Sequence, residues 1–113
     1  MIRFILAIAI FFSATESTAG ETWSDRDICR AATKTYFWLS ELPSDAPNQG
    51  QYMGFRSAKQ NYYTCRVDDR VADFRWLNKS SESMKSRSTK IVVSDGTLTV
   101  ISDMKTERFT KSK

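Results

Sequence analysis

Cys29 and Cys65 are the only cysteines in this chain of 113 residues, and they constrain its fold more than any other feature. They follow an N-terminal segment with a short basic start, nine consecutive apolar residues (4–12) and a small-x-small cleavage pattern before Gly20. Exported proteins fold in an oxidising compartment, where an even number of cysteines favours a disulfide. We therefore expect a signal peptide at residues 1–19 and a Cys29–Cys65 bond; two buried free thiols are the alternative.

Residues 20–113 are long enough for one small domain whose core alone gives marginal stability. Closing the loop between the cysteines would add about 3.8 kcal/mol in a chain-entropy model. The apolar run of the leader is too short to cross a bilayer and the mature part holds no comparable run, so no transmembrane segment is expected. The predicted location is periplasmic or secreted.

The start of the mature chain predicts a helix. Ser24 and Asp27 form a capping box, and Trp23 can pack on Ile28 as a hydrophobic staple. Residues at helical spacing then predict one buried stripe: Ile28, Ala32, Thr35 and Leu39. Leu42–Pro43 is the predicted end, because proline disfavours helix at the preceding residue and cannot donate to the helix ladder.

Residues 44–50 are dense in turn-forming residues and predict a polar connector. A first strand is expected at residues 51–56, with Met53 and Phe55 facing inward. Gly54 between them indicates a bulge or the close approach of another element.

Residues 61–77 predict a β-hairpin, because two runs alternate with period two around a turn at residues 68–70. Either possible turn register brings the same side chains to one face: Tyr63, Cys65, Val67, Ala72, Phe74 and Trp76. A bond from Cys65 to Cys29 would fix the helix across this aromatic row. We expect the core there.

The remainder predicts a Ser-rich, mobile connector at residues 78–89, a hairpin and a last edge strand at 105–110 anchored by Phe109. Asp95–Gly96 suits a type I′ turn, which would place Val93 opposite Leu98. The expected fold is α+β, with one N-terminal helix disulfide-linked to an antiparallel sheet of about five strands.

These motifs resemble those of a family of small exported bacterial proteins of unknown function. That family has an Ile-Cys-Lys/Arg-Ala-Ala helix and a Cys-Lys/Arg-Val strand, which correspond here to residues 28–32 and 65–67. The match spans most of the mature chain, but residues 72–75 lengthen the strand that ends at Trp76. The resemblance implies a helix bridged to an antiparallel sheet, and it implies no activity.

Few residues are available for catalysis. Histidine is absent, which removes the commonest general base and zinc ligand, and a disulfide would remove thiol chemistry. We expect no catalytic residue, metal or cofactor. Asp68, Asp69 and Asp73 leave a hydrolase as a remote alternative, although Asp68 and Asp69 stand where a turn favours aspartate.

The outer face of the first hairpin is the predicted binding surface, through Tyr62, Arg66 and Arg75. Tyrosine and arginine are enriched at interfaces because they combine apolar area with directed hydrogen bonds. We therefore predict an exported, non-enzymatic binding module whose partner is another envelope or extracellular protein. The alternative is a solvated sheet face on which Arg66 pairs with Asp73.

Charge suggests a second candidate function. The net charge of +4 comes from residues 79–113, which hold eight Lys or Arg residues against four acids. This region could bind anionic envelope polymers or lipid head groups, or it could simply be a solvated surface. Nucleic acid is not an expected partner, because the chain is predicted to be exported and an acid lies on the aromatic face.

Overall fold

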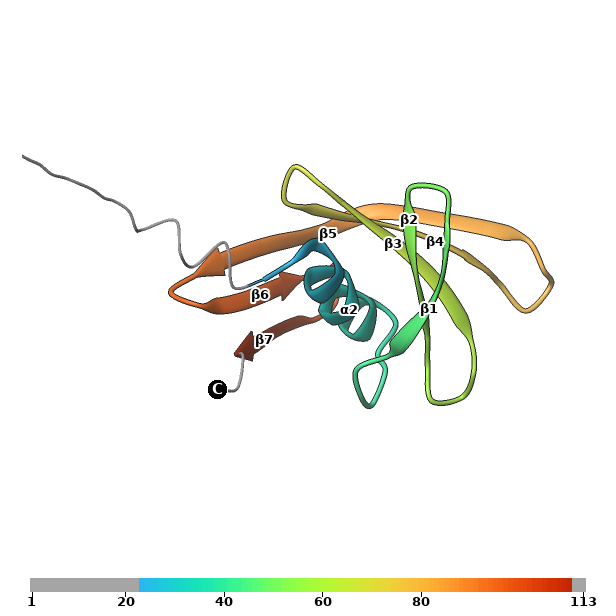
Figure 1. The fold of residues 1–113 in the computed structure, drawn as a ribbon, viewed down its shortest axis with the longest axis horizontal. Helices are drawn as coiled ribbons and strands as arrows, with labels where there is room; N and C mark the ends of the chain where they lie inside the picture. Colours follow the sequence, from blue (N-terminus) through green and yellow to red (C-terminus); the bar gives the residue numbers. More distant parts are fainter. Residues whose placement is uncertain (1–22, 111–113) are drawn as a thin grey trace, which may run out of the picture.

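The structure is a computed structural model that describes residues 23–110, so the predicted signal peptide lies outside the described residues. Helix α2 (Asp25–Tyr36) packs on one face of a seven-stranded antiparallel sheet (Figure 1). The strands lie in the order of the sequence: β1 (Ser44–Gln49), β2 (Tyr52–Arg56), β3 (Tyr62–Asp68), β4 (Val71–Leu77), β5 (Ser83–Ser94), β6 (Thr97–Ile101) and β7 (Thr106–Thr110). The α+β class is confirmed, but the prediction of about five strands is wrong.

One additional strand and a longer β5 come from polar segments that predicted connectors. Residues 44–49 form β1, which pairs with β2, and residues 83–89 form the first half of β5, which pairs with β4. Backbone hydrogen bonds to a neighbouring strand hold these segments, so they need few apolar side chains. Only residues 78–82 of the second predicted connector are a turn.

Helix α2 begins where the sequence predicts. The Ser24 hydroxyl accepts a hydrogen bond of 3.1 Å from the backbone N–H of Asp27. Trp23 and Ile28 are both buried in the core, and the Trp23 indole donates a 3.0 Å hydrogen bond to the carbonyl of Gly96. The start of the helix is thereby attached to the β5–β6 turn.

The helix ends at Tyr36, so the predicted end at Leu42–Pro43 is wrong. The N–H of Leu39 donates to the carbonyl of Lys34 (2.9 Å) and Trp38 adopts a φ of 56°, which together form a Schellman-type closure. The chain has therefore left helical geometry before the proline can act. Leu39 consequently lies beyond the buried stripe.

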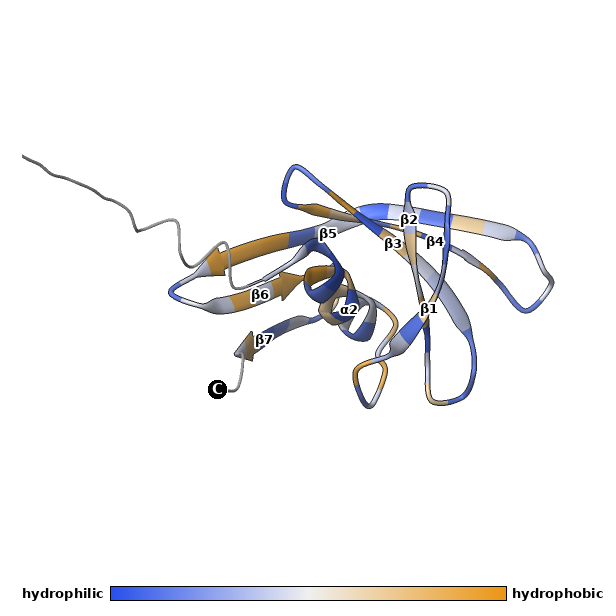
Figure 2. Ribbon diagram, viewed as in Figure 1, coloured by the Kyte–Doolittle hydropathy of each residue, from blue (hydrophilic) through white to orange (hydrophobic). Residues whose placement is uncertain are grey.

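The face covered by α2, called the inner face below, carries the core. The predicted pairing of Val93 with Leu98 is confirmed. In the first hairpin, the turn lies at Asp69–Arg70, the second of the two registers that the sequence allows, and Cys65 stands opposite Phe74. Figure 2 shows hydrophobic residues concentrated in β6 and the second half of β5, beside the helix. The buried apolar residues form one cluster: Trp23, Ile28, Cys29, Ala31, Ala32, Phe55, Cys65, Ala72, Phe74, Ile91, Leu98 and Val100.

β1 folds closely over the opposite, outer face of β2 at Gly54. A Cβ atom on Gly54 would lie 2.0 Å from the carbonyl oxygen of Pro47, which no real side chain tolerates. The predicted close approach at this glycine is thus confirmed. Because β1 crosses here, the sheet is curled over the outer face of β2 and β3.

Candidate binding face

The Cys29–Cys65 disulfide is present and joins α2 to β3, with the two Cα atoms 5.7 Å apart. Both cysteines are fully buried. The bond holds the helix against the inner face, as the sequence predicts. Side chains that point the other way from β3 and β4 are consequently left on the outer face.

Tyr62, Arg66 and Arg75 all belong to this outer face. On β3 and β4, Cys65 and Phe74 point inward, so the residues on either side of each point outward. Thr64 lies opposite Arg75 and donates its hydroxyl hydrogen bond to the Arg75 carbonyl (2.9 Å).

A hollow of about 280 Å³ brings two of the three predicted residues together. We call it the outer-face hollow, and its lining residues come from β1, β3, β4 and the start of β5: Gln49, Tyr62, Thr64, Arg75, Trp76, Leu77 and Ser83. Arg66 does not line it. The hollow therefore combines a phenol, a threonine hydroxyl and one guanidinium group.

Tyr62 is held firmly at the edge of this hollow. Its hydroxyl donates a 2.6 Å hydrogen bond to the carbonyl of Pro47 on β1, and the Arg56 guanidinium lies 5.3 Å from its ring centroid. The ring is thus oriented before any ligand arrives, which lowers the entropic cost of binding.

Arg66 is engaged by neighbouring acids. It donates a 3.0 Å hydrogen bond to Asp73, which raises the pKa of Arg66, and it lies 3.9 Å from Asp68. The cross-strand pair with Asp73 considered from the sequence is therefore present. Arg66 also lies over the ring of Tyr52, whose hydroxyl donates to Asp73 (3.0 Å).

Arg75 has no carboxylate partner among residues 23–110. Its guanidinium lies 5.0 Å from the centroid of the Tyr52 ring, on an exposed part of the face. Directly across the β4–β5 ladder stands Lys85, which likewise forms no ion pair within the described range. Two like charges opposite each other on one sheet face destabilise the pair, so an anion bound between them would relieve the repulsion.

Tyr52 and Lys85 are the members of this face that sequence reasoning missed. Tyr52 could have been found, because its alternation with inward Met53 places it outside. Lys85 could not, because it lies in a Ser-rich polar segment that predicts a connector.

The three aspartates of the remote hydrolase alternative lie in structural roles. Asp69 lies in the β3–β4 turn with a φ of 52°, and Asp73 is buried and accepts from Tyr52 and Arg66. Asp68 forms a 3.2 Å ion pair with Arg87. These contacts neutralise Asp68 and Asp73 with arginine and lend no support to acid–base chemistry. Within the described chain, no three His, Cys, Asp or Glu residues are grouped to hold a metal ion.

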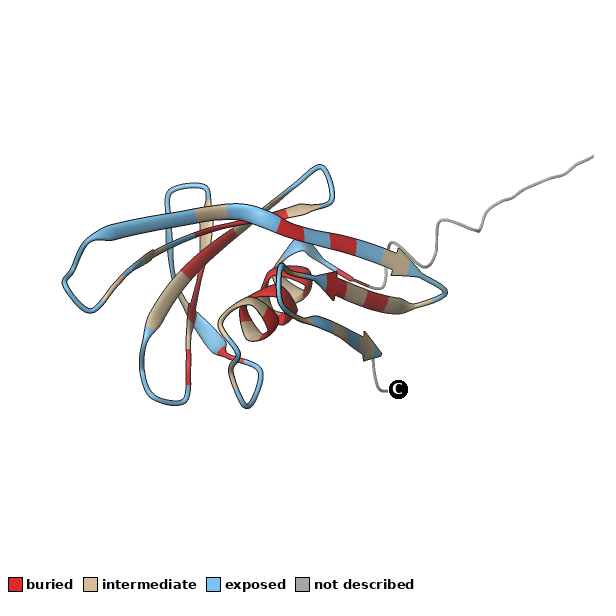
Figure 3. Cartoon of the chain, turned by 180° about the vertical axis from the view of Figure 1, so that it is seen from behind, coloured by how far each residue is buried: buried red, intermediate tan, exposed pale blue. Residues whose placement is uncertain are grey.

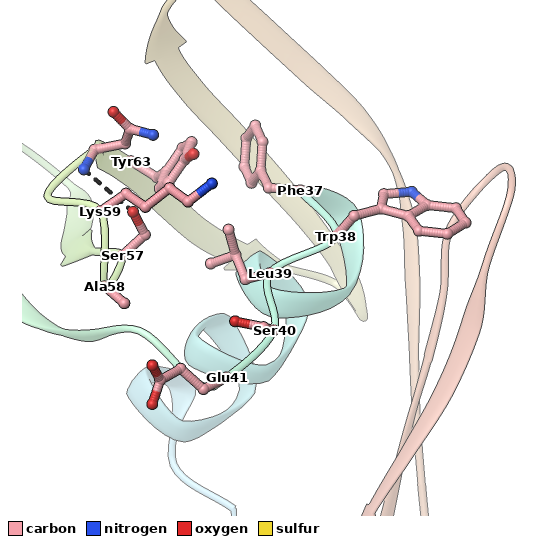
Figure 4. A pocket seen from close by; sticks show the side chains of 10 residues that line it. Phe37, Trp38, Leu39, Ser40, Glu41, Ser57, Ala58, Lys59 and Tyr63 are labelled. Atoms are coloured by element: carbon pink, nitrogen blue, oxygen red, sulfur yellow. Dashed lines mark hydrogen bonds between the residues drawn. The ribbon is translucent and has the colours of Figure 1, made fainter.

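A second pocket, of about 320 Å³, lies where the loop after α2 faces the β2–β3 connection. Figure 4 shows Leu39 and the Lys59 amine directed into this space, beside Phe37 and Tyr63, whereas Trp38 points away from it. Phe37 and Tyr63 pack with ring centroids 4.2 Å apart. Its aromatic wall thus belongs to the packing that anchors the helix end.

Comparisons with protein-family models, with curated proteins and with solved structures give no match to this chain. Among the residues that the structure describes, no helix has the length and apolar character needed to traverse a membrane.

Proposed function

We propose that this protein is an exported, non-enzymatic binding module that recognises another envelope or extracellular protein through its outer face. Tyr62, Arg66 and Arg75 are the proposed contact residues. The buried disulfide supports this location, because such bonds persist in periplasmic and secreted proteins. The resemblance to small exported bacterial proteins agrees with the same compartment.

One observation carries the proposal: the unneutralised Arg75–Lys85 pair beside a hollow edged by a preoriented tyrosine. An exposed aspartate or glutamate of the partner would place its carboxylate between the two cations. Arginine binds carboxylates with two parallel hydrogen bonds, which gives direction as well as attraction. Arg66 would contact the partner as well, although it is already paired with Asp73 and lies over the Tyr52 ring, which Arg75 also contacts.

The test is capture by the immobilised, oxidised protein from the envelope fraction of its source, comparing wild type with Arg75→Gln. Arg108→Gln is the matched control. Arg108 lies on β7, is also exposed and forms no ion pair with another residue in the range 23–110. We expect a stoichiometric protein partner that Arg75→Gln loses and Arg108→Gln keeps. A partner retained by both variants overturns the proposal.

The second candidate function is a cationic binder of anionic polymers or lipid head groups through residues 79–113. Lys85 and Lys90, both exposed on β5, favour it. Lys105, however, lies 3.8 Å from Glu107 and 4.8 Å from the centroid of the Trp38 ring, so part of the charge is already engaged.

Binding to vesicles that contain phosphatidylglycerol separates the two candidates. A cationic surface at residues 79–113 predicts steep loss of vesicle binding between low and physiological salt. It also predicts that Arg108→Gln, which lies in that region, weakens binding more than Arg75→Gln, which lies outside it. Binding that is insensitive to salt contradicts this second candidate.

A further inference from the structure

Each edge of β5 is paired with a neighbouring strand along only part of its length. Its ladder with β4 runs from Ser83 to Lys90, whereas its ladder with β6 covers only Lys90 to Ser94. From Ser83 to Arg87 the edge away from β4 therefore has no strand partner among the described residues. Figure 3 shows this half of β5 exposed, in contrast to the alternating buried residues of the other half.

The open edge is long enough to pair with another strand. It ends near Ser88, whose hydroxyl donates a 3.4 Å hydrogen bond to Asp103 in the β6–β7 turn. Alternate residues of an edge strand direct unpaired N–H and C=O groups outward, which makes the edge a template for strand addition. Five residues match the length of an ordinary strand.

Each face beside this edge has its own chemistry. On the outer face stand Lys85 and Arg87; Lys85 has no ion pair in the part of the chain that the structure describes. On the inner face stands Met84, opposite Trp76 and 39% exposed. A hollow of about 220 Å³ lies by the β6–β7 turn and is lined by Tyr36, Trp38, Ser102, Asp103 and Met104.

We propose that the open edge of β5 accepts an extended segment of a partner protein with acidic and apolar side chains in alternation. The acidic side chains would lie on the outer face beside Lys85 and Arg87. The apolar side chains would lie on the inner face beside Met84 and the exposed Met104. Period-two alternation of a strand satisfies both faces at once.

A second copy of this chain is a poor occupant of the same edge. Antiparallel self-pairing centred on Ser86 would place Lys85 of each copy opposite Arg87 of the other. Directly opposed like charges are destabilising in a sheet. Charge complementarity therefore selects an acidic segment over a dimer.

The probe is a blocked heptapeptide in which valine and glutamate alternate, added to the oxidised protein. We expect slowed amide hydrogen exchange at Ser83–Arg87 and no binding of the valine–lysine counterpart. Lys85→Glu should weaken binding at least fivefold. Lys90→Glu is the matched control, because Lys90 lies on the same strand, exposed, but is paired on both edges, and its effect should stay within twofold.

Three results overturn the inference: equal weakening by the two charge reversals, binding without exchange protection at Ser83–Arg87, or a dimer in sedimentation whose interface is this edge. The same peptide with alternate N-methyl groups should fail to bind, since it cannot pair with an edge. The proposed function is tested by Arg75→Gln capture, so either idea can fail while the other stands.

Discussion

The ammonium group of Lys34 on α2 donates a 2.5 Å hydrogen bond to the carboxylate of Glu107 on β7, across 73 positions of sequence. The Thr35 hydroxyl donates to the other carboxylate oxygen (3.0 Å), and the Lys34 ammonium lies 5.9 Å from the Phe109 ring centroid. Within residues 23–110, β7 is an edge strand whose one neighbour is β6. These contacts therefore attach the last strand to the helix.

Glu107→Gln should lower the free energy of unfolding by about 1–2 kcal/mol at pH 7, because it removes a charge-assisted hydrogen bond. Partial burial alone would raise the pKa of Glu107, but hydrogen bonds from Lys34 and Thr35 outweigh it and hold the pKa below its usual 4.5. The stabilisation is then full above pH 4.5 and is lost as the pH falls through the lower folded-state pKa.

Urea unfolding at several pH values checks this. The stability difference between wild type and Glu107→Gln should shrink below pH 4.5, while Glu41→Gln, at an exposed glutamate, should change stability little at any pH. A difference that is independent of pH would contradict the role of the carboxylate.

Removing the disulfide should cost about 2–5 kcal/mol, because the unfolded chain regains the freedom of a long loop. The double variant Cys29→Ser/Cys65→Ser should show this loss in urea unfolding. Reduction of the wild type should give a similar loss, with a mass increase of two hydrogens. Equal stability of oxidised and reduced protein would contradict the prediction.

Gly54→Ala should displace β1 from β2, because the added methyl group meets the backbone carbonyl of Pro47. Overpacking against backbone costs about 1–3 kcal/mol, and faster amide exchange should appear in β1. Gly50→Ala is the comparison. Among the described residues, no atom beyond the adjacent ones lies within 4 Å of its Cβ position, so its cost arises from the positive φ of 61° alone. Unchanged exchange in β1 of Gly54→Ala would refute the steric account.

Trp38→Gly should be more stable than Trp38→Ala by about 1–2 kcal/mol. Both variants remove the indole, which is 61% exposed, but only glycine adopts the φ of 56° without strain. Thermal unfolding of the pair measures the difference directly. Equal stability would mean that the closure after Tyr36 rearranges when the indole is absent.

Much of the fold was predictable because local rules and the core agree. The capping hydroxyl of Ser24 and the Asp95–Gly96 turn each indicate one geometry, and the alternation of residues 61–77 indicates one set of inward-facing residues; the structure has all three. Two cysteines allow only one intramolecular pairing, so the link between helix and sheet followed as well.

The surroundings of the proposed contact residues could be predicted only in part. Side-chain direction on β3 and β4 follows from period two, so Tyr62, Arg66 and Arg75 lie on one face as expected. The charged residues that surround them do not follow from the period-two alternation. Arg66 is neutralised by Asp73, whereas Arg75 stands opposite a lysine from a segment that has no apolar pattern.

The sequence by itself determined the helix start and the inward-facing residues of the hairpins, because these depend on neighbouring residues. It also determined the disulfide pairing, because there are only two cysteines. The export leader stays a prediction. The tertiary structure alone decided that polar segments become strands, because hydrogen bonds to a neighbouring strand hold them. It also decided the position of Lys85. In the β4–β5 ladder, Asp73 faces two residues of β5, so a bulge reverses the alternation between Ser86 and Thr89. Counting back from the buried Ile91 would have placed Lys85 inside; the bulge places it beside Arg75.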